Sequence, residues 1–174
     1  MAKRSDFERE PRDFYPTPVE AVEPLFPHIV QYTKFIEPCA GDGRLIRHLQ
    51  GRGHECVYAC DIEPQGQKIE KRDVLFFDKP LPPCDAIITN PPWSRESLHA
   101  MIDIFRVQAP TFLLFDADWC HTIQAKPFLP FCRKIISIGR VKWIEDSDSS
   151  GVDNACWYEF GKDYAQQTVF IGRK

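Results

Sequence analysis

Residues 34–53 constrain the fold more than any other part of the chain. The segment opens with a short apolar strand pattern (KFIE), passes through a turn of small residues (PCAGDG) and continues as a helical pattern (RLIRHLQ). Leu45, Ile46 and Leu49 fall on one face of that helix, which ends at Gly51. A strand that leads through a glycine turn directly into a helix is the unit from which parallel sheets are built. The segment therefore predicts an α/β fold.

The rest of the chain repeats this alternation and then departs from it. Further strand patterns occur at 56–61, near 73–75, at 85–90 and at 111–118, and residues 96–108 have helical spacing. Strands that alternate with helices predict a mostly parallel sheet with helices on both faces. The last strand patterns, at 133–144, 154–160 and 167–172, follow one another without a helix-length segment between them. We therefore expect antiparallel strands at the C-terminal end of the sheet.

Length and composition predict one globular domain. A chain of 174 residues buries roughly 70% of the surface that its unfolded form exposes. We expect residues 14–174 to form this domain and the polar residues 1–13, which carry mixed charge, to be a flexible arm. No apolar stretch reaches the roughly 18 to 20 residues that a membrane-spanning helix requires. Seven scattered cysteines without a C-x-x-C pair indicate reduced thiols, and the N-terminus has no export signal, so we expect a cytoplasmic protein.

Small and acidic residues follow three of the predicted strands. Ligands of open α/β sheets bind at the carboxyl ends of the strands. The turn at 40–43 lets the backbone approach a ligand closely, but it lacks the G-x-G-x-x-G spacing of a dinucleotide site. Asp61 can accept hydrogen bonds from both hydroxyls of a ribose, and Asp73 from an adenine amino group. These residues favour a nucleoside-containing cofactor, whereas the glycine turn taken alone fits a purely structural role equally well.

The run Asn90-Pro91-Pro92-Trp93 follows the strand pattern at 85–90. Two prolines remove hydrogen-bond donors at the end of a strand, which is a poor choice for structure alone. The run holds the Asn90 side-chain oxygen and a main-chain carbonyl as neighbouring acceptors, which suits an –NH₂ group held through both hydrogens. Trp93 offers a flat face on which a planar base or amide can stack. The pattern indicates a site that activates an amino nitrogen, the alternative being a proline-rich turn with a buried Trp.

Taken in order, these motifs resemble those of S-adenosylmethionine-dependent amino-methyltransferases, especially DNA adenine-N6 methyltransferases of the small bacterial and phage type. The resemblance rests on Glu37 to Gly43, Asp61, Asp73 and Asn90 to Trp93, together with the segment FYPTP at 14–18, and covers roughly residues 14–160. It implies a Rossmann-like class I methyltransferase sheet and S-adenosyl-L-methionine as the cofactor. Trp93 stands where Tyr or Phe is commoner in that family, which keeps the stacking face and enlarges it.

The resemblance also implies roles for individual residues. Tyr15, Thr17 and Pro18 line the methionine end of the cofactor, and residues 37–43 pass beneath it. The cofactor-binding residues that it implies are Tyr15, Thr17, Pro18, Glu37, Cys39, Ala40, Gly41, Gly43, Asp61, Ile62, Asp73, Val74 and Asn90. The catalytic residues that it implies are Asn90, Pro91, Pro92 and Trp93.

Charged residues supply candidates for substrate contact. The net charge of −3, from 22 basic and 25 acidic residues, is not that of a protein that binds nucleic acid over a wide surface, so such contacts must come from local patches. The candidates are Arg44, Arg47, Arg95, Asp116, Arg140 and Lys142, with Arg133 and Lys134 grouped with the last two in one patch of four positive charges. A solvated charged surface explains these positions about equally well.

No metal site is expected, because no second ligand cluster accompanies His54, Cys56 and Cys60. The acidic segment 145–153 lacks the glutamate that a calcium loop requires at its twelfth position. We expect this segment to be a flexible loop between strands.

The sequence thus predicts a methyltransferase that acts on the N6 amine of adenine in DNA. The family's separate target-recognition region has no counterpart here, which predicts short or minimal sequence specificity. Adenine in RNA and the side-chain nitrogen of glutamine in a protein remain alternatives, since the same motif serves any planar nitrogen. A catalytically silent partner subunit that binds the cofactor is the alternative of another class.

Overall fold

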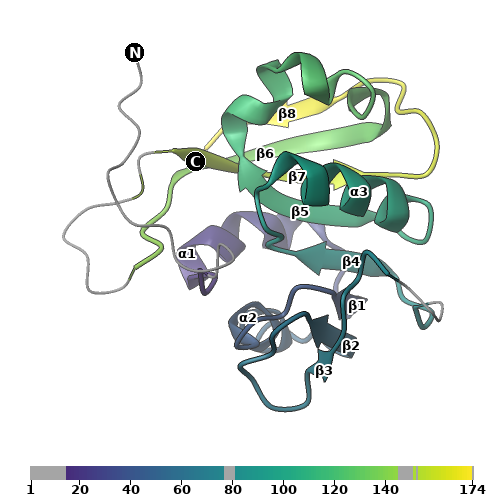
Figure 1. Ribbon diagram of the computed structural model, residues 1–174. Helices are drawn as coiled ribbons and strands as arrows, with labels where there is room; N and C mark the ends of the chain where they lie inside the picture. The colour runs from purple at the N-terminus through teal and green to yellow at the C-terminus, as the bar shows by residue number, and fades with distance from the viewer. Residues whose placement is uncertain (1–14, 77–80, 145–150, 152, 174) are drawn as a thin grey trace.

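The computed structural model describes residues 15–76, 81–144, 151 and 153–173 (Figure 1). Within these residues, eight strands form one sheet in the order β3-β2-β1-β4-β5-β7-β6-β8. The strands are β1 (Lys34–Glu37), β2 (Glu55–Asp61), β3 (Glu70–Lys71), β4 (Ala86–Thr89), β5 (Thr111–Asp116), β6 (Cys132–Arg140), β7 (Asn154–Phe160) and β8 (Val169–Ile171). The helical elements are α1 (Val19–Val22), η2 (Glu23–His28), α2 (Arg44–Gln50), α3 (Arg95–Arg106), η3 (Ala117–His121), η4 (Ile123–Ala125) and η5 (Leu129–Phe131).

The sheet is mostly parallel, as the alternation of strands and helices predicts. Strands β3, β2, β1, β4 and β5 pair in parallel along the sheet. Strand β7 reverses the direction and pairs antiparallel with both β5 and β6. The expectation of antiparallel pairing at the C-terminal end is therefore confirmed. The reversal is confined to β7, because β8 joins β6 in parallel at the outer edge.

Helical segments cover both faces of the sheet, and each face has its own apolar cluster. Alternate residues of the central strands point to opposite faces, so that Leu113 joins one cluster and Leu114 the other. Helix α3 covers the first face with Leu98, Met101 and Phe105, which recur at helical spacing and are buried. Helices α1 and α2 and the η2 segment cover the opposite face.

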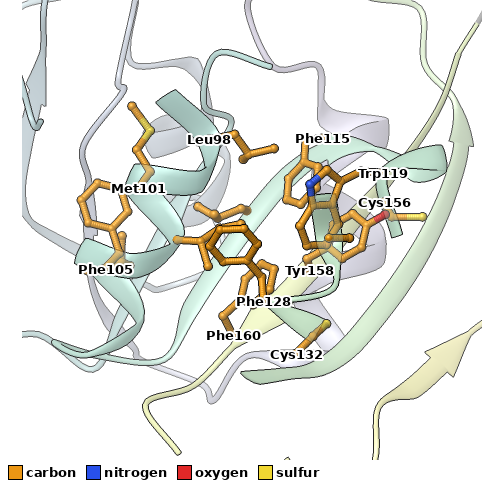
Figure 2. Packing of buried hydrophobic residues seen from close by; sticks show 14 of the residues in the cluster. Leu98, Met101, Phe105, Phe115, Trp119, Phe128, Cys132, Cys156, Tyr158 and Phe160 are labelled. Atoms are coloured by element: carbon orange, nitrogen blue, oxygen red, sulfur yellow. The ribbon is translucent and has the colours of Figure 1, made fainter. Parts of the chain in front are cut away.

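The face under α3 holds a dense group of aromatic rings (Figure 2). Phe115 and Tyr158 stack with ring centroids 4.1 Å apart, and Trp119 meets Phe115 edge to face at 5.1 Å. The Tyr158 hydroxyl donates to the main-chain oxygen of Asp116 at 3.1 Å. This packing fixes the carboxyl end of β5 and the segment that follows it.

Most strands and helices begin and end close to the positions that the sequence predicts. The strand expected near 73–75 is shorter and earlier, since β3 comprises Glu70 and Lys71 and residues 74–75 form a turn. Two of the expectations, the arm at 1–13 and most of the acidic loop at 145–153, lie outside the described residues. In the described part of the chain, no helix combines the length and the apolar character needed to cross a bilayer.

Candidate functional site

A pocket of about 260 Å³ opens at the carboxyl ends of β1, β2 and β4. Parallel strands bring the residues that follow each of them to this one edge, although they are far apart in the sequence. The predicted cofactor residues that line the pocket are Tyr15, Thr17, Glu37, Cys39, Ala40, Gly41, Asp61, Ile62, Asp73, Val74 and Asn90. Pro18 and Gly43 are not among the lining residues. Pro18 precedes α1 and Gly43 precedes α2, so they shape the two segments that lead into these helices.

The glycine turn is tied to Asp61 through its backbone. The Gly41 N–H donates to Asp61 Oδ2 at 2.8 Å, and the Glu63 N–H donates to Asp61 Oδ1 at 2.8 Å. Gly43 has φ of +77°, a left-handed conformation that favours glycine, and its N–H donates to the Ala40 carbonyl at 2.7 Å. The turn therefore holds Asp61 at the pocket wall, while each carboxylate oxygen keeps a further lone pair for a ligand.

The loop that follows Asp61 closes over the glycine turn. The N–H groups of Gln65 and Gly66 donate to the Gly41 carbonyl at 2.9 and 3.2 Å. A Cβ atom on Gly66 would lie 2.7 Å from the Asp42 carbonyl oxygen, so this approach requires glycine. Glu63 and Gln65 line the pocket, and sequence reasoning missed both. The turn-forming run Pro64-Gln65-Gly66 is the signal that could have indicated this loop.

Asp73 lies two residues beyond the end of β3, within the pocket wall. Its Oδ1 accepts a hydrogen bond from the Leu75 N–H at 2.9 Å, which fixes the turn. The neighbouring Arg72, which the sequence did not single out, also lines the pocket, and its guanidinium donates to the Tyr58 hydroxyl at 3.2 Å. Both residues therefore belong to the end of the pocket beside β2 and β3.

Glu37 is a buried carboxyl group in the wall of the pocket, with 1% of its surface exposed. The Cys39 N–H donates to Oε1 at 3.2 Å, whereas Oε2 is buried without a hydrogen-bond partner. Burial raises the pKa of Glu37 from 4.5 to about 8, because the charged form loses its hydration. The nearby Thr89 hydroxyl and the Cys39 N–H oppose this shift, and the charge of Asp61 adds to it. At neutral pH this carboxyl group is mostly protonated, and a cationic group of a ligand bound beside it would favour its charged form.

Asn90 directly follows β4 and faces the N-terminal segment. Its amide nitrogen donates to the Thr17 hydroxyl at 3.2 Å and to the Tyr15 carbonyl at 3.5 Å. These contacts use the two amide hydrogens, so the side-chain oxygen Oδ1 remains to accept hydrogen bonds. Pro92 also lines the pocket, whereas Pro91 is buried beneath it.

Trp93 lies next to the pocket but does not line it. Its ring meets that of Trp143 at 86°, with centroids 5.8 Å apart, in an edge-to-face contact. Trp143 comes from the segment after β6, where Gly151 donates to the Val141 carbonyl at 2.8 Å. Sequence reasoning missed Trp143. The sequence pattern had placed it inside a strand at 133–144, whereas β6 ends at Arg140 and leaves Trp143 in the segment that follows.

Three of the predicted substrate-binding cations are paired with carboxylates. Arg44 Nε and Arg47 Nη2 lie 3.5 and 3.6 Å from Asp42 Oδ2. Arg95 Nη2 donates to Asp116 Oδ2 at 2.9 Å, and this ion pair connects the start of α3 to the end of β5. These pairs partly neutralise the positive charge that the sequence suggested at the mouth of the site.

The four positive charges that we expected in one patch around β6 lie at the two ends of that strand. Arg133 and Lys134 lie near the start of β6, where Lys134 Nζ donates to Glu159 at 2.6 Å. Arg140 is the last residue of β6 and Lys142 follows it, so both lie at the opposite end. A strand rises about 3.3 Å per residue, which separates the two groups by roughly 20 Å.

Among the described residues no group of three or more His, Cys, Asp or Glu side chains could hold a metal ion. All seven cysteines are free thiols.

Several of the solved structures that the fold resembles are named as methyltransferases. A protein of Pyrococcus horikoshii, provisionally assigned as an RNA methyltransferase, aligns with a TM-score of 0.64 and 15% identity over 88% of this chain and 87% of its own. A dimethyladenosine transferase of Plasmodium falciparum aligns with a TM-score of 0.55 and 12% identity over 84% of this chain and 62% of its own. The M protein of the type I restriction enzyme EcoKI aligns with a TM-score of 0.55 and 12% identity over 89% of this chain and 46% of its own.

The fold is that of a class I methyltransferase. S-adenosylmethionine is the cofactor expected with this fold. The chain spans 62% of the length of the dimethyladenosine transferase and 46% of the length of the M protein. The chain matches no protein-family profile and no curated protein sequence.

Proposed function

We propose that this chain is an S-adenosylmethionine-dependent methyltransferase that acts on the N6 amine of adenine in DNA. One observation carries the proposal. The Asn90 side chain lines the pocket of a class I methyltransferase fold, and its amide hydrogens are used by Thr17 and Tyr15. The acceptor Oδ1 is thereby oriented by the protein before any substrate binds.

The pocket residues fit the proposed cofactor. The unpartnered Oε2 of Glu37 would accept a hydrogen bond from the cationic amino group at the methionine end. Asp61 would hold the ribose hydroxyls, and Asp73 with Val74 would hold the adenine ring at the end beside β3. When bound there, the cofactor supplies a methyl group activated by its sulfonium charge.

Asn90 and Pro91 would bind the target amine. Asn90 Oδ1 and the Pro91 carbonyl accept its two hydrogens, which makes the nitrogen lone pair more available for attack on the methyl group. Trp93 provides a stacking face for the base, and Trp143 limits the space beside it. The base must leave a duplex, or be single-stranded, to reach this position.

Adenine in RNA is the second candidate. The fold aligns over most of this chain with a protein provisionally assigned as an RNA methyltransferase and also with a dimethyladenosine transferase. The same residues would hold the amine in either polymer, so the two candidates differ in the backbone that is bound rather than in the chemistry.

Transfer of labelled methyl groups tests the proposal. Duplex DNA, single-stranded DNA, RNA and total protein are offered in parallel, and the labelled nucleoside or amino acid is identified by mass. We expect N6-methyladenine in DNA in many sequence contexts. Label in RNA or in glutamine would show that the substrate is RNA or protein instead of DNA. Cofactor binding without any transfer would indicate a catalytically silent subunit.

The Asn90→Ala variant is the matched control for this assay. Transfer should fall by two decades or more, or roughly 3 kcal/mol in the barrier, while the cofactor dissociation constant stays nearly unchanged. Loss of cofactor binding in this variant would contradict the role given to Asn90.

A further inference from the structure

Arg95 and Asp116 form an ion pair between the two segments that flank the proposed target site. Arg95 is the first residue of α3, two residues after Trp93, and Asp116 is the last residue of β5, the strand beside β4. Arg95 Nη2 donates to Asp116 Oδ2 at 2.9 Å, and the two side chains are 35% and 22% exposed. Solvent screens a partly buried pair of this kind less than a pair on the open surface. The contact therefore ties the start of α3 to the neighbouring strand.

Asp116 is held in place independently of Arg95. Its Oδ1 accepts a hydrogen bond from the Asp118 N–H at 2.9 Å, which caps η3, and its main-chain oxygen accepts from the Tyr158 hydroxyl at 3.1 Å. Tyr158 in turn stacks on Phe115 within the aromatic group of Figure 2. Asp116 is therefore part of the rigid end of β5, and Oδ2 is the carboxylate oxygen that remains for Arg95.

The run Asn90 to Trp93 has few hydrogen bonds that could fix its backbone. Pro91 and Pro92 have no N–H group. Residues 91–93 form no hydrogen bond with any other described residue. The ring of Trp93 packs against both apolar clusters, but apolar packing is not directional and leaves the direction of nearby carbonyl groups open. The direction of the Pro91 carbonyl therefore depends on how the two ends of the run are held.

Side chains hold both ends of the run. At the end of β4, Asn90 donates to the Thr17 hydroxyl at 3.2 Å and to the Tyr15 carbonyl at 3.5 Å. At the start of α3, Ser94 forms no side-chain cap, so the helix lacks the hydrogen bond that a serine commonly supplies at this position. The ion pair of Arg95 with Asp116 is the charged contact that holds this second end.

Arg95 is turned toward the protein rather than toward a ligand. Its Nη2 is bonded to Asp116, and its Nη1 is buried without a partner among the described residues. An arginine that binds phosphate commonly offers two parallel N–H groups to the ligand. His99, one turn further along α3, also faces the segment after β5, since its Nε2 accepts from Trp119 Nε1–H at 3.0 Å. Arg95 therefore fits a positioning role better than the substrate contact that the sequence suggested.

We propose that Arg95, held by Asp116, is the positioning residue for the run Asn90 to Trp93. The ion pair fixes the first residue of α3 and, through the short run before it, the Pro91 carbonyl that accepts one hydrogen of the target amine. A displacement of about 1 Å at such an acceptor can lower the rate by roughly 100-fold. This inference rests on the proposed function and adds to it a residue that acts through the run rather than on the substrate.

Variants of the full chain test this proposal. Arg95→Gln removes the cation, and Asp116→Asn removes the negative charge but keeps a side-chain oxygen that can cap η3. Asp103→Asn is the matched control, because Asp103 pairs with Arg106 at 3.2 Å at the other end of α3. Transfer of labelled methyl groups to an adenine-containing, single-stranded DNA oligonucleotide gives kcat and KM for each protein.

We expect kcat to fall about tenfold in Arg95→Gln and in Asp116→Asn, while the oligonucleotide KM and the cofactor dissociation constant stay within about twofold. The double variant should be no slower than the slower single variant, because both changes break the same pair. Arg95→Lys, which keeps the positive charge, should retain more of kcat than Arg95→Gln. The control should keep kcat within about twofold of the wild-type value.

Two kinetic results would overturn the inference. The first is a wild-type kcat in both single variants. The second is an oligonucleotide KM that rises in Arg95→Gln but not in Asp116→Asn. That result would mean that Arg95 binds the substrate directly, since Asp116→Asn frees its guanidinium for such a contact.

Amide hydrogen exchange, followed by mass spectrometry, tests the positioning without relying on activity. Peptides that cover residues 93–98 should exchange about tenfold faster in both single variants, while those that cover β4 keep the wild-type rate. Unchanged exchange at 93–98 would overturn the inference. If these rates rise but the wild type transfers no methyl group, the inference stands and the proposed function fails. If the wild type methylates DNA and the variants keep its kcat and exchange rates, the function stands and the inference fails.

Discussion

The amide nitrogen of Asn90 donates to the hydroxyl of Thr17, 3.2 Å away, across a separation of 73 residues in the sequence. Thr17 is 5% exposed and immediately precedes the turn into α1. Trp157 of β7 anchors that helix by donating from its indole nitrogen to the Ala21 carbonyl at 2.7 Å. The orientation of Asn90 thus depends on a segment that is anchored to β7 on the face of the sheet that α1 covers.

Thr17→Val removes the hydroxyl and keeps the side-chain shape. It leaves an amide hydrogen of Asn90 without its partner, at a cost of about 1 to 3 kcal/mol if the side chain stays in place. We expect kcat to fall roughly tenfold or more while the substrate KM changes little. Thr17→Ser keeps the hydroxyl and should retain most of the activity. Equal activity in the two variants would show that the hydroxyl does not orient Asn90.

Asp61→Ala should act on cofactor binding first. It removes the proposed ribose acceptor and also leaves the N–H groups of Gly41 and Glu63 without their 2.8 Å partner. We expect the cofactor dissociation constant to rise about 10- to 100-fold, measured by calorimetry. Asp85→Ala is a matched control, because Asp85 Oδ2 accepts from the Lys34 N–H at 2.8 Å at the opposite edge. A wild-type dissociation constant in Asp61→Ala would refute the assignment.

Gly66→Ala should displace the loop that lies over the glycine turn. The added Cβ meets the Asp42 carbonyl oxygen at 2.7 Å, and the backbone there cannot move without disturbing Gly41. We expect a lower melting temperature and cofactor binding weakened by roughly tenfold or more. Gly172→Ala, where nothing lies within 4 Å, is the control. If both variants behave alike, the close contact of the loop with the turn has no bearing on the pocket.

The sequence predicted the sheet and most of the pocket because short-range patterns determine both. Apolar strands followed by small or acidic residues place Gly41, Asp61 and Asn90 at one edge once the strands are parallel. The alternation of strands and helices fixed that direction without any knowledge of long-range contacts.

What the sequence did not reveal depends on contacts between distant segments. Trp143 reaches Trp93 through the order of β4, β5, β7 and β6, which no local pattern encodes. The grouping of charges around β6 was wrong because two of the four lie at the other end of the strand. Arg173 acquires its place from a glycine bulge in a neighbouring strand. Each of these features requires the tertiary pairing to be known.

Glu37 makes cofactor binding and stability depend on pH. Its pKa of about 8 in the folded protein, against 4.5 normally, means that the folded protein keeps a proton that the unfolded chain releases. Between these two values the unfolded state binds fewer protons, so the free energy of unfolding falls as the pH rises. Glu37→Gln removes this contribution, and its stability relative to the wild type should rise across that window by at most about 4 kcal/mol. Urea unfolding at several pH values measures the difference.

The same proton links Glu37 to the cofactor. A cationic amino group bound beside Glu37 favours the carboxylate, so binding at neutral pH should release a proton, and wild-type affinity should increase as the pH approaches 8. Calorimetry in two buffers of different ionisation enthalpy counts that proton. The Glu37→Gln variant, which cannot ionise at this position, should release none. Burial is the main cause of the raised pKa of Glu37. If both proteins release the same number of protons, the cofactor's cationic group binds elsewhere in the pocket.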